Sequence, residues 1–159
     1  MERKTPLYQT HVDAGGKIVE FGGFLMPVQY PTGVLAEHMA VRQKAGLFDV
    51  SHMGELRLKG PDAIANVQKL ITADISTMQD GDIKYAMFCN DAGGILDDFI
   101  VYRCAADDYW LVVNAGNRDK DAAWVESHLF GDVDYRDEGD DWGQVALQGP
   151  KSGDILKKL

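Results

Sequence analysis

A mixed fold of helices and antiparallel strands is predicted by three observations on this 159-residue sequence. Stretches with strand-like alternation and stretches with helical spacing follow one another, separated by glycine and proline turn signals. Residues 85–89, 95–103 and 109–114 are consecutive apolar runs joined by short turns, which is typical of an antiparallel meander. The chain is long enough to bury a core without a disulfide or a metal, so we expect one domain.

The first part of the chain predicts a strand pair, a helix and a single strand. Residues 18–30 carry two short apolar runs split by two glycines, as in a bent or hairpin pair. Residues 34–45 have the apolar spacing of a helix, and Gly46 is expected to end it. Residues 54–59 alternate between apolar and charged side chains, which predicts a half-buried strand.

The remaining elements are predicted from residues that begin or end helices and from local charge. Pro61 is expected to open a helix, and Asn117 is a plausible N-cap for another helix that runs to Phe130. Residues 131–141 are rich in Asp and Glu and predict a solvated acidic loop. A short strand over 145–148 leads into a last helix, whose apolar spacing is still unfinished where the sequence stops.

Charge and composition exclude several classes of partner and of active site. Sixteen Lys and Arg against 25 Asp and Glu give a net charge of −9, which disfavours nucleic acid and anionic membranes as partners. We find no bilayer-spanning run and no secretory signal, and expect a soluble, cytoplasmic protein. Cys89 and Cys104 are expected to be free thiols. Phosphate-loop, dinucleotide, metal-ligand and catalytic-triad spacings are not found, so we expect no metal.

Two adjacent carboxylates, Asp97 and Asp98, stand inside an otherwise apolar strand. Successive side chains point to opposite faces, both faces read as buried, and periodicity does not choose between the two residues. A hairpin loop over 105–107 would pair Cys104 with Asp108 and place Tyr102 opposite Trp110 and Asp98 opposite Asn114. A carboxylate and a carboxamide would then share one face. Such a pair suits a flat, nitrogen-rich heterocycle. Tyr85 is expected within about one residue of Asp98. The alternative is that Asp98 only accepts backbone N–H groups of the glycine turn at 93–94.

A set of short strings is distributed through nearly the whole chain, at residues 5–8, His11, 23–30, 37–38, 41–42, 45–54, 93–98, 114–115 and 147–150. Together these strings resemble the aminomethyltransferase family, the T-protein of the glycine cleavage system. One departure is Phe24, where the family usually has Trp.

The resemblance implies an α+β fold in which an antiparallel sheet packs with helices, and residues 1–159 form the first part of a folate-binding domain built from two similar halves. Family members transfer the methylene of a lipoyl-bound aminomethyl group to tetrahydrofolate and release ammonia. The resemblance makes Asp98 the catalytic residue, and Met53, Tyr85, Val113 and Asn114 folate-binding residues. The expected partners are tetrahydrofolate, as co-substrate, and the lipoylated carrier (H-) protein.

The family's remaining folate ligands lie beyond Leu159, so the fragment is expected to be weakly active or inactive, unless a homodimer supplies the missing half. His52, in the same motif as Met53, is expected to be structural. Two other classes remain open. One is a related folate-dependent demethylase, and the other is a non-enzymatic folate-binding module of the kind that assists iron–sulfur cluster assembly. Carrier-dependent ammonia release belongs only to the aminomethyltransferase, and demethylation only to the second class.

Overall fold

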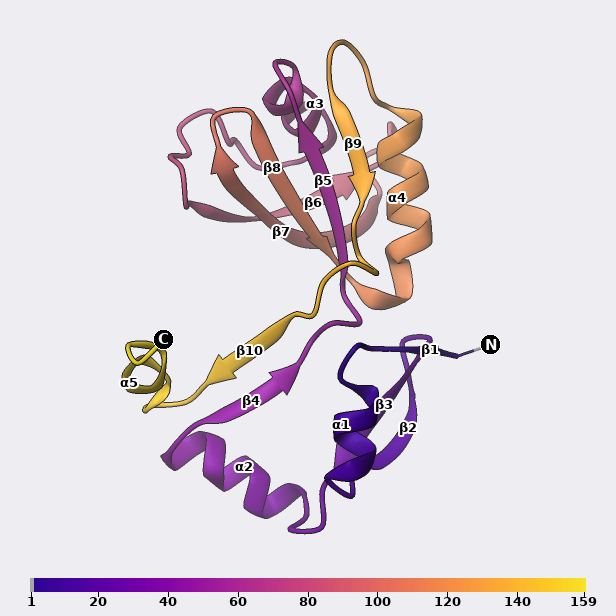
Figure 1. Cartoon of the computed structure of the whole chain (residues 1–159). Coiled ribbons are helices and arrows are strands. Elements are labelled where there is room, and N and C mark those ends of the chain that lie inside the picture. The colour runs from indigo at the N-terminus through magenta and orange to yellow at the C-terminus, as the bar shows by residue number, and fades with distance from the viewer. Residues whose placement is uncertain (1) are drawn as a thin grey trace. The chain divides into compact units, whose positions relative to one another are not determined.

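The computed structural model describes residues 2–159. Its elements are labelled along the chain in Figure 1. The residues fall into two compact units, which are treated separately below. The terminal unit consists of the chain up to His52 together with Trp142–Leu159, and the central unit is Met53–Asp141.

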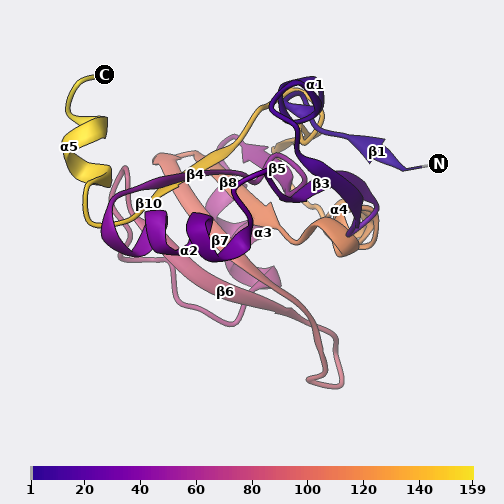
Figure 2. The ribbon, with the colours of Figure 1, turned by 90° about the horizontal axis from the view of Figure 1, so that it is seen from below.

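The central unit is built on a five-stranded antiparallel sheet with the strand order β6-β7-β8-β5-β9. Strands β6 and β7 run side by side and extend into a long hairpin (Figure 2). The strand β5 lies between β8 and β9 and pairs with both. The strands are β5 (Gly54–Lys59), β6 (Ile83–Cys89), β7 (Ile95–Ala105), β8 (Asp108–Val113) and β9 (Asp134–Asp137).

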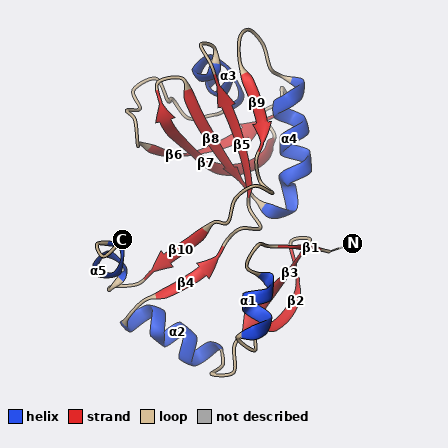
Figure 3. Ribbon diagram, in the orientation of Figure 1, coloured by secondary structure: helices blue, strands red, loops and turns tan. Residues whose placement is uncertain are grey.

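One face of this sheet carries the hydrophobic core. The helices α3 (Ala63–Leu70) and α4 (Arg118–Ser127) lie beside the sheet (Figure 3), and the short 3₁₀ helix η1 (Ala115–Asn117) precedes α4. Both helices supply buried side chains to the core. Burying large apolar side chains is the main source of folding free energy. The largest fully buried apolar side chains of this core are Tyr109, Phe88, Leu56, Leu58, Ile75, Leu111, Val67, Val101, Val113 and Val125.

The terminal unit holds two small sheets and three helices. In the first sheet, β3 pairs in parallel with β1 and antiparallel with β2. In the second, β4 and β10 are antiparallel although they come from opposite ends of the sequence. The elements are β1 (Arg3–Lys4), α1 (Tyr8–Asp13), β2 (Lys17–Phe21), β3 (Phe24–Gln29), α2 (Val34–Gln43), β4 (Gly46–Asp49), β10 (Val145–Gln148) and α5 (Ser152–Leu156).

The predicted meander, the strand over 54–59, the hairpin within 18–30 and the strand over 145–148 are confirmed. Three other predictions are corrected. The helix from residue 34 ends at Gln43, because Gly46 already pairs with Gln148 in a strand. The acidic segment 131–141 is not all loop, since it contains β9.

The third correction concerns Asn117. It stands at the N-cap position of α4, yet its side chain does not cap the helix. Its amide instead donates to Asp97 Oδ1 at 2.9 Å. The helix also ends at Ser127, short of the expected Phe130.

Two further observations concern the cysteines and the helices. Cys89 and Cys104 are free thiols, as predicted. In the part of the chain that the structure describes, the helices are too short or too polar to cross a bilayer.

Candidate functional site

The strand β7 separates its two carboxylates onto opposite faces of the central sheet. Asp97 shares the core face with Phe99 and Val101, which are 3% and 0% exposed. Asp98 lies on the outer face and is exposed, beside Ile100, which is 36% exposed. The expectation that both faces are buried is therefore wrong. The outer face is exposed around Asp98 and Ile100, and Asp98 is the carboxylate that it presents.

Tyr85 from the neighbouring strand β6 binds this carboxylate. The Tyr85 hydroxyl donates to Asp98 Oδ2 at 2.6 Å, and this hydrogen bond, ahead of burial and nearby charge, raises the pKa of the phenol. Met87 is the direct partner of Asp98, whereas Tyr85 pairs with Ile100. Tyr85 thus stands two residues from the position opposite Asp98, one more than predicted, and reaches it because a tyrosine side chain spans a diagonal cross-strand distance.

The side chains around Asp98 on this face are apolar. Ile100 and Tyr102 share the face because side chains alternate along β7. Ile100 pairs with Val112, and Tyr102 pairs with Trp110, as the hairpin register predicted. Together with Met87 they surround one carboxylate with an apolar surface, a composition typical of small-molecule sites.

Asn114 directly follows β8, and its amide is oriented by two acceptors. Its Nδ2 donates to Asp97 Oδ1 at 3.1 Å and to the Asp98 carbonyl oxygen at 2.7 Å. The register that pairs Ile100 with Val112 places Asn114 opposite Asp98, as predicted, but the Asn114 amide bonds to the neighbouring carboxylate and to the Asp98 backbone rather than to the Asp98 carboxylate. Both amide hydrogens are used, so Asn114 Oδ1 is left as an acceptor for a ligand.

The alternative role for Asp98 in the glycine turn is not observed. Asn90 holds that turn, since its Oδ1 accepts the backbone N–H of Gly94 at 2.8 Å and its carbonyl oxygen accepts that of Gly93. The Asp98 carboxylate is thus not used to cap the turn. Among the described residues, Tyr85 is the side chain that donates to it.

The other predicted folate residues are placed differently. Val113 is fully buried in the core, so its side chain cannot line a site on the outer face. Met53 is half-buried and immediately precedes β5, whose Gly54 pairs with Val113. His52 belongs to the terminal unit, where it packs edge-on against Phe21 and Phe24, as a structural histidine does.

A second carboxyl group on this side of the sheet was missed by the sequence analysis. Glu55 pairs with Val112 and is 3% exposed. Burial, opposed by the charge of Arg118, raises the pKa of Glu55 to about 7. Its position on an alternating strand predicted an exposed charge, and only the tertiary packing buries it.

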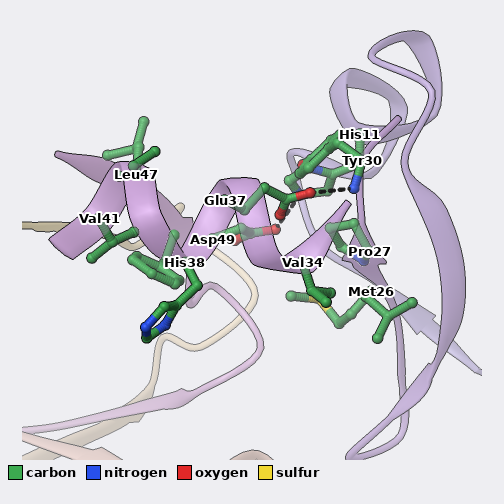
Figure 4. Close-up of a pocket in the computed structure, with 14 residues that line it drawn as sticks. His11, Met26, Pro27, Tyr30, Val34, Glu37, His38, Val41, Leu47 and Asp49 are labelled. Atoms are coloured by element: carbon green, nitrogen blue, oxygen red, sulfur yellow. Dashed lines mark hydrogen bonds and ion pairs between the residues drawn. The ribbon is translucent and has the colours of Figure 1, made fainter. Parts of the chain in front are cut away.

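A cavity in the terminal unit is lined by none of the predicted site residues. Its volume is about 560 Å³ and its walls are mainly apolar. Four of its polar residues are paired with one another: His11 contacts the Tyr30 hydroxyl at 2.7 Å and Asp49 Oδ2 at 2.8 Å, and Glu37 accepts the Tyr30 backbone N–H (Figure 4). Because these groups are already paired, the cavity is a weaker candidate for chemistry than the Asp98 face.

The central unit is thus an antiparallel sheet with helices on its core face and an exposed carboxylate, that of Asp98, on the other face. The family described as "GCVT N-terminal domain" matches residues 7–159, and the chain belongs to that family. This confirms the resemblance drawn from the sequence.

Relatives agree with this assignment. The chain is 51% identical over 158 residues to an aminomethyltransferase of Desulfitobacterium hafniense, covering 99% of this chain and 43% of the relative. It is 50% identical over 159 residues to an aminomethyltransferase of Staphylococcus haemolyticus, covering 99% and 43%. The crystal structure of glycine cleavage system aminomethyltransferase T from Bartonella henselae is 37% identical with a TM-score of 0.91, covering 99% of this chain and 44% of that one. The α+β fold class is confirmed, and the chain spans less than half the length of these relatives.

Proposed function

We propose that this chain is the first part of a tetrahydrofolate-dependent aminomethyltransferase. In the proposed reaction, the methylene of an aminomethyl group carried on a lipoyl arm passes to tetrahydrofolate, and ammonia is released. The observation that carries the proposal is the Asp98 carboxylate, exposed on an apolar sheet face and bonded through one oxygen to Tyr85 at 2.6 Å. The names of the relatives support the reaction class.

The residues on this face fit the group that they are proposed to hold. Tyr85 binds Oδ2 of Asp98, which leaves Oδ1 to accept a hydrogen bond from a ligand N–H. Asn114 Oδ1 is a second acceptor, since its Nδ2 is already committed. A flat heterocycle with several N–H donors and two apolar faces, such as the pterin of tetrahydrofolate, complements this arrangement.

Asp98 is the proposed catalytic residue. Its carboxylate would accept a hydrogen bond from the reacting ring system and stabilise the positive charge that develops as the nitrogen forms a new bond. Tyr85, Asn114 and Met53 would hold the ring. Val113, whose side chain is in the core, would contribute through its backbone only.

The proposed macromolecular partner is the lipoylated carrier protein. Because the chain spans 43% of its relatives, full activity is expected to need the remaining sequence, or a second copy of this chain that supplies the missing half. Light scattering at high concentration tests that homodimer, and a strictly monomeric chain would exclude it. Carrier-dependent ammonia release, rather than demethylation, is the product test for the reaction class.

Calorimetric titration with 5-formyltetrahydrofolate, a stable analogue of the proposed substrate, tests the site. We expect saturable binding by the chain and roughly 10- to 100-fold weaker binding by Asp98→Asn, because a hydrogen bond to a charged group is lost. Asp91→Asn is the matched control, since Asp91 is exposed in the turn of the same hairpin. Equal affinity of the two variants would refute the assignment of Asp98.

A further inference from the structure

Beneath the Asp98 face, two buried carboxyl groups meet across the core side of β7. Asp97 is 6% exposed, and Asp121, in the first turn of α4, is 0% exposed. Each carboxyl group acts on the pKa of the other through a side-chain hydrogen bond, and Asp97 Oδ2 and both oxygens of Asp121 are buried without a donor from another described group. Two carboxylates have only acceptors, so this contact requires a proton on one of them.

The surroundings place that proton on Asp121. Burial, and then the hydrogen bond with Asp97 and the charge of Asp97, raise the pKa of Asp121 to about 8. Burial also acts to raise the pKa of Asp97, but hydrogen bonds from Asp121, Asn114 and Asn117 outweigh it and leave that pKa lowered. No N–H or O–H of another described residue reaches Asp97 Oδ2 or either oxygen of Asp121, which leaves these atoms to share the proton.

Other charged groups near the pair do not remove the need for this proton. Lys120 Nζ lies 3.8 Å from Asp121 Oδ1 but is half exposed and donates to the Leu96 carbonyl oxygen at 2.6 Å. Asp98 is adjacent in sequence on the opposite face, with Tyr85 bonded to it. The nearest cation therefore offsets only part of the cost of two buried negative charges.

Asp97 connects the carboxyl pair to the Asp98 site through hydrogen bonds. Its Oδ1 accepts the amides of Asn117 at 2.9 Å and of Asn114 at 3.1 Å. The second Asn114 hydrogen goes to the Asp98 carbonyl oxygen at 2.7 Å. The Asp97 carboxylate thus fixes the amide of Asn114, which ties the end of β8 to the backbone of Asp98.

We propose that Asp121 is a positioning residue, which keeps its proton, shares it with Asp97 and so holds the Asp97 carboxylate where it orients Asn114 against Asp98. Only the identity of the ligand rests on the proposed function. Loss of the proton would leave two like charges in contact, and the pair would separate. Asn114 would then lose its side-chain acceptor, and its amide would no longer be fixed.

The first test needs no substitution. In a pH titration of the ¹³C-carboxyl resonances of the chain, we expect Asp121 to be protonated near pH 6 while Asp97 is ionised, and the two to titrate as a coupled pair. Two ionised carboxyls near pH 6 would overturn the proposal.

The second test compares variants. Asp121→Asn keeps an N–H donor toward Asp97, Asp121→Ala removes it, and Glu126→Gln is the control because Glu126 is exposed on the same helix. We expect the Asn114 side-chain amide signals to shift and broaden in Asp121→Ala, and to stay as in the control in Asp121→Asn. Unchanged Asn114 signals in Asp121→Ala would refute the positioning role. If Asp121→Ala does not fold, the carboxyl titration and the Asp121→Asn rescue still decide.

A third readout is the affinity for 5-formyltetrahydrofolate. We expect about tenfold weaker binding by Asp121→Ala and a change of about twofold or less for Asp121→Asn, as for the loss and retention of one hydrogen bond. Equal binding by wild type and Asp121→Ala contradicts the proposal. Failure of the wild type to bind contradicts the proposed function instead, because the carboxyl and Asn114 signals are measured without ligand.

Discussion

The terminal unit is predicted to depend on one carboxyl group, that of Asp49. Its Oδ2 accepts hydrogen bonds from Thr5 Oγ1 at 2.7 Å and from His11 Nε2 at 2.8 Å, and its Oδ1 accepts the Ser51 backbone N–H at 2.9 Å. The Asp49 side chain is only 2% exposed. These bonds link the N-terminal segment, α1, β4 and the turn after it.

The unit has little apolar burial to replace them. Among residues 2–52 and 142–159, Phe24 and Met26 are the buried apolar side chains, whereas the core of the central unit is extensive. Burial acts to raise the pKa of Asp49, but hydrogen bonds from His11, Ser51 and Thr5 outweigh it and lower the pKa. The charged form is therefore favoured by folding, and its contribution is present above the unfolded pKa of about 4 and lost as the pH falls through the lowered value.

We expect Asp49→Asn to destabilise the terminal unit by about 3 kcal/mol, because it removes the charge and turns one acceptor into a donor that faces two donors. Hydrogen exchange measures this locally. The backbone N–H groups of Gly16 and Val50 bond to carbonyl oxygens within the unit and should exchange about 100-fold faster. Val101, in the sheet of the central unit, should be unaffected.

The control is Asp13→Asn, since Asp13 is exposed and accepts a bond from Gln9 on the same helix. Its exchange should match the wild type. A change in Asp49→Asn smaller than about threefold, or equal acceleration at Val101, would refute the claim that this carboxylate holds the terminal unit.

Three further predictions concern the central unit. Folding raises the pKa of Asp121 to about 8, so the stabilising contribution of its protonated form is complete below about pH 4 and is lost as the pH rises toward 8. In urea unfolding, the free energy of unfolding of the wild type should therefore fall by at most about 1.4 kcal/mol per pH unit over this range. Asp121→Asn should remove that fall. Phe88→Ala should cost about 3 to 5 kcal/mol in the same assay, since Phe88 is fully buried with its ring 4.0 Å from that of Phe99. Gly60→Ala should cost about 2 kcal/mol, because φ is +133° and the new Cβ would lie 2.7 Å from the Asp132 carbonyl oxygen; Gly153→Ala, with open space around it, should cost much less. Equal slopes for wild type and Asp121→Asn, or losses below about 1 kcal/mol for the other two, would contradict these assignments.

Local patterns predicted the strands well because alternation and turn residues are local signals. The register of β7 with β8 came out right at Tyr102 and Trp110 although the turn is tighter than predicted. Ala105, rather than Cys104, pairs with Asp108, and an irregularity between Arg103 and Ala105 restores the register. The predicted loop is one residue longer than the observed loop, and the bulge takes up that residue, so Tyr102 still pairs with Trp110.

What the sequence could not decide was set by long-range packing. The two faces of β7 carry similar apolar residues in the sequence. Only the helices that pack on the Asp97 side make that face the core. The same packing buries the Val113 side chain, which the family resemblance made a folate-binding residue. The acidic residues after 131 read as loop, yet β5 offers an edge to which Tyr135 and its neighbours pair.

The location of the bound folate is the most direct test of the account. Backbone and side-chain NMR shifts of the chain should be followed as 5-formyltetrahydrofolate is added. We predict saturable NMR shifts at Tyr85, Asp98, Ile100 and Asn114. Shifts confined to the His11 cavity, or no shifts in a folded chain, would contradict the claim that the Asp98 face binds the pterin.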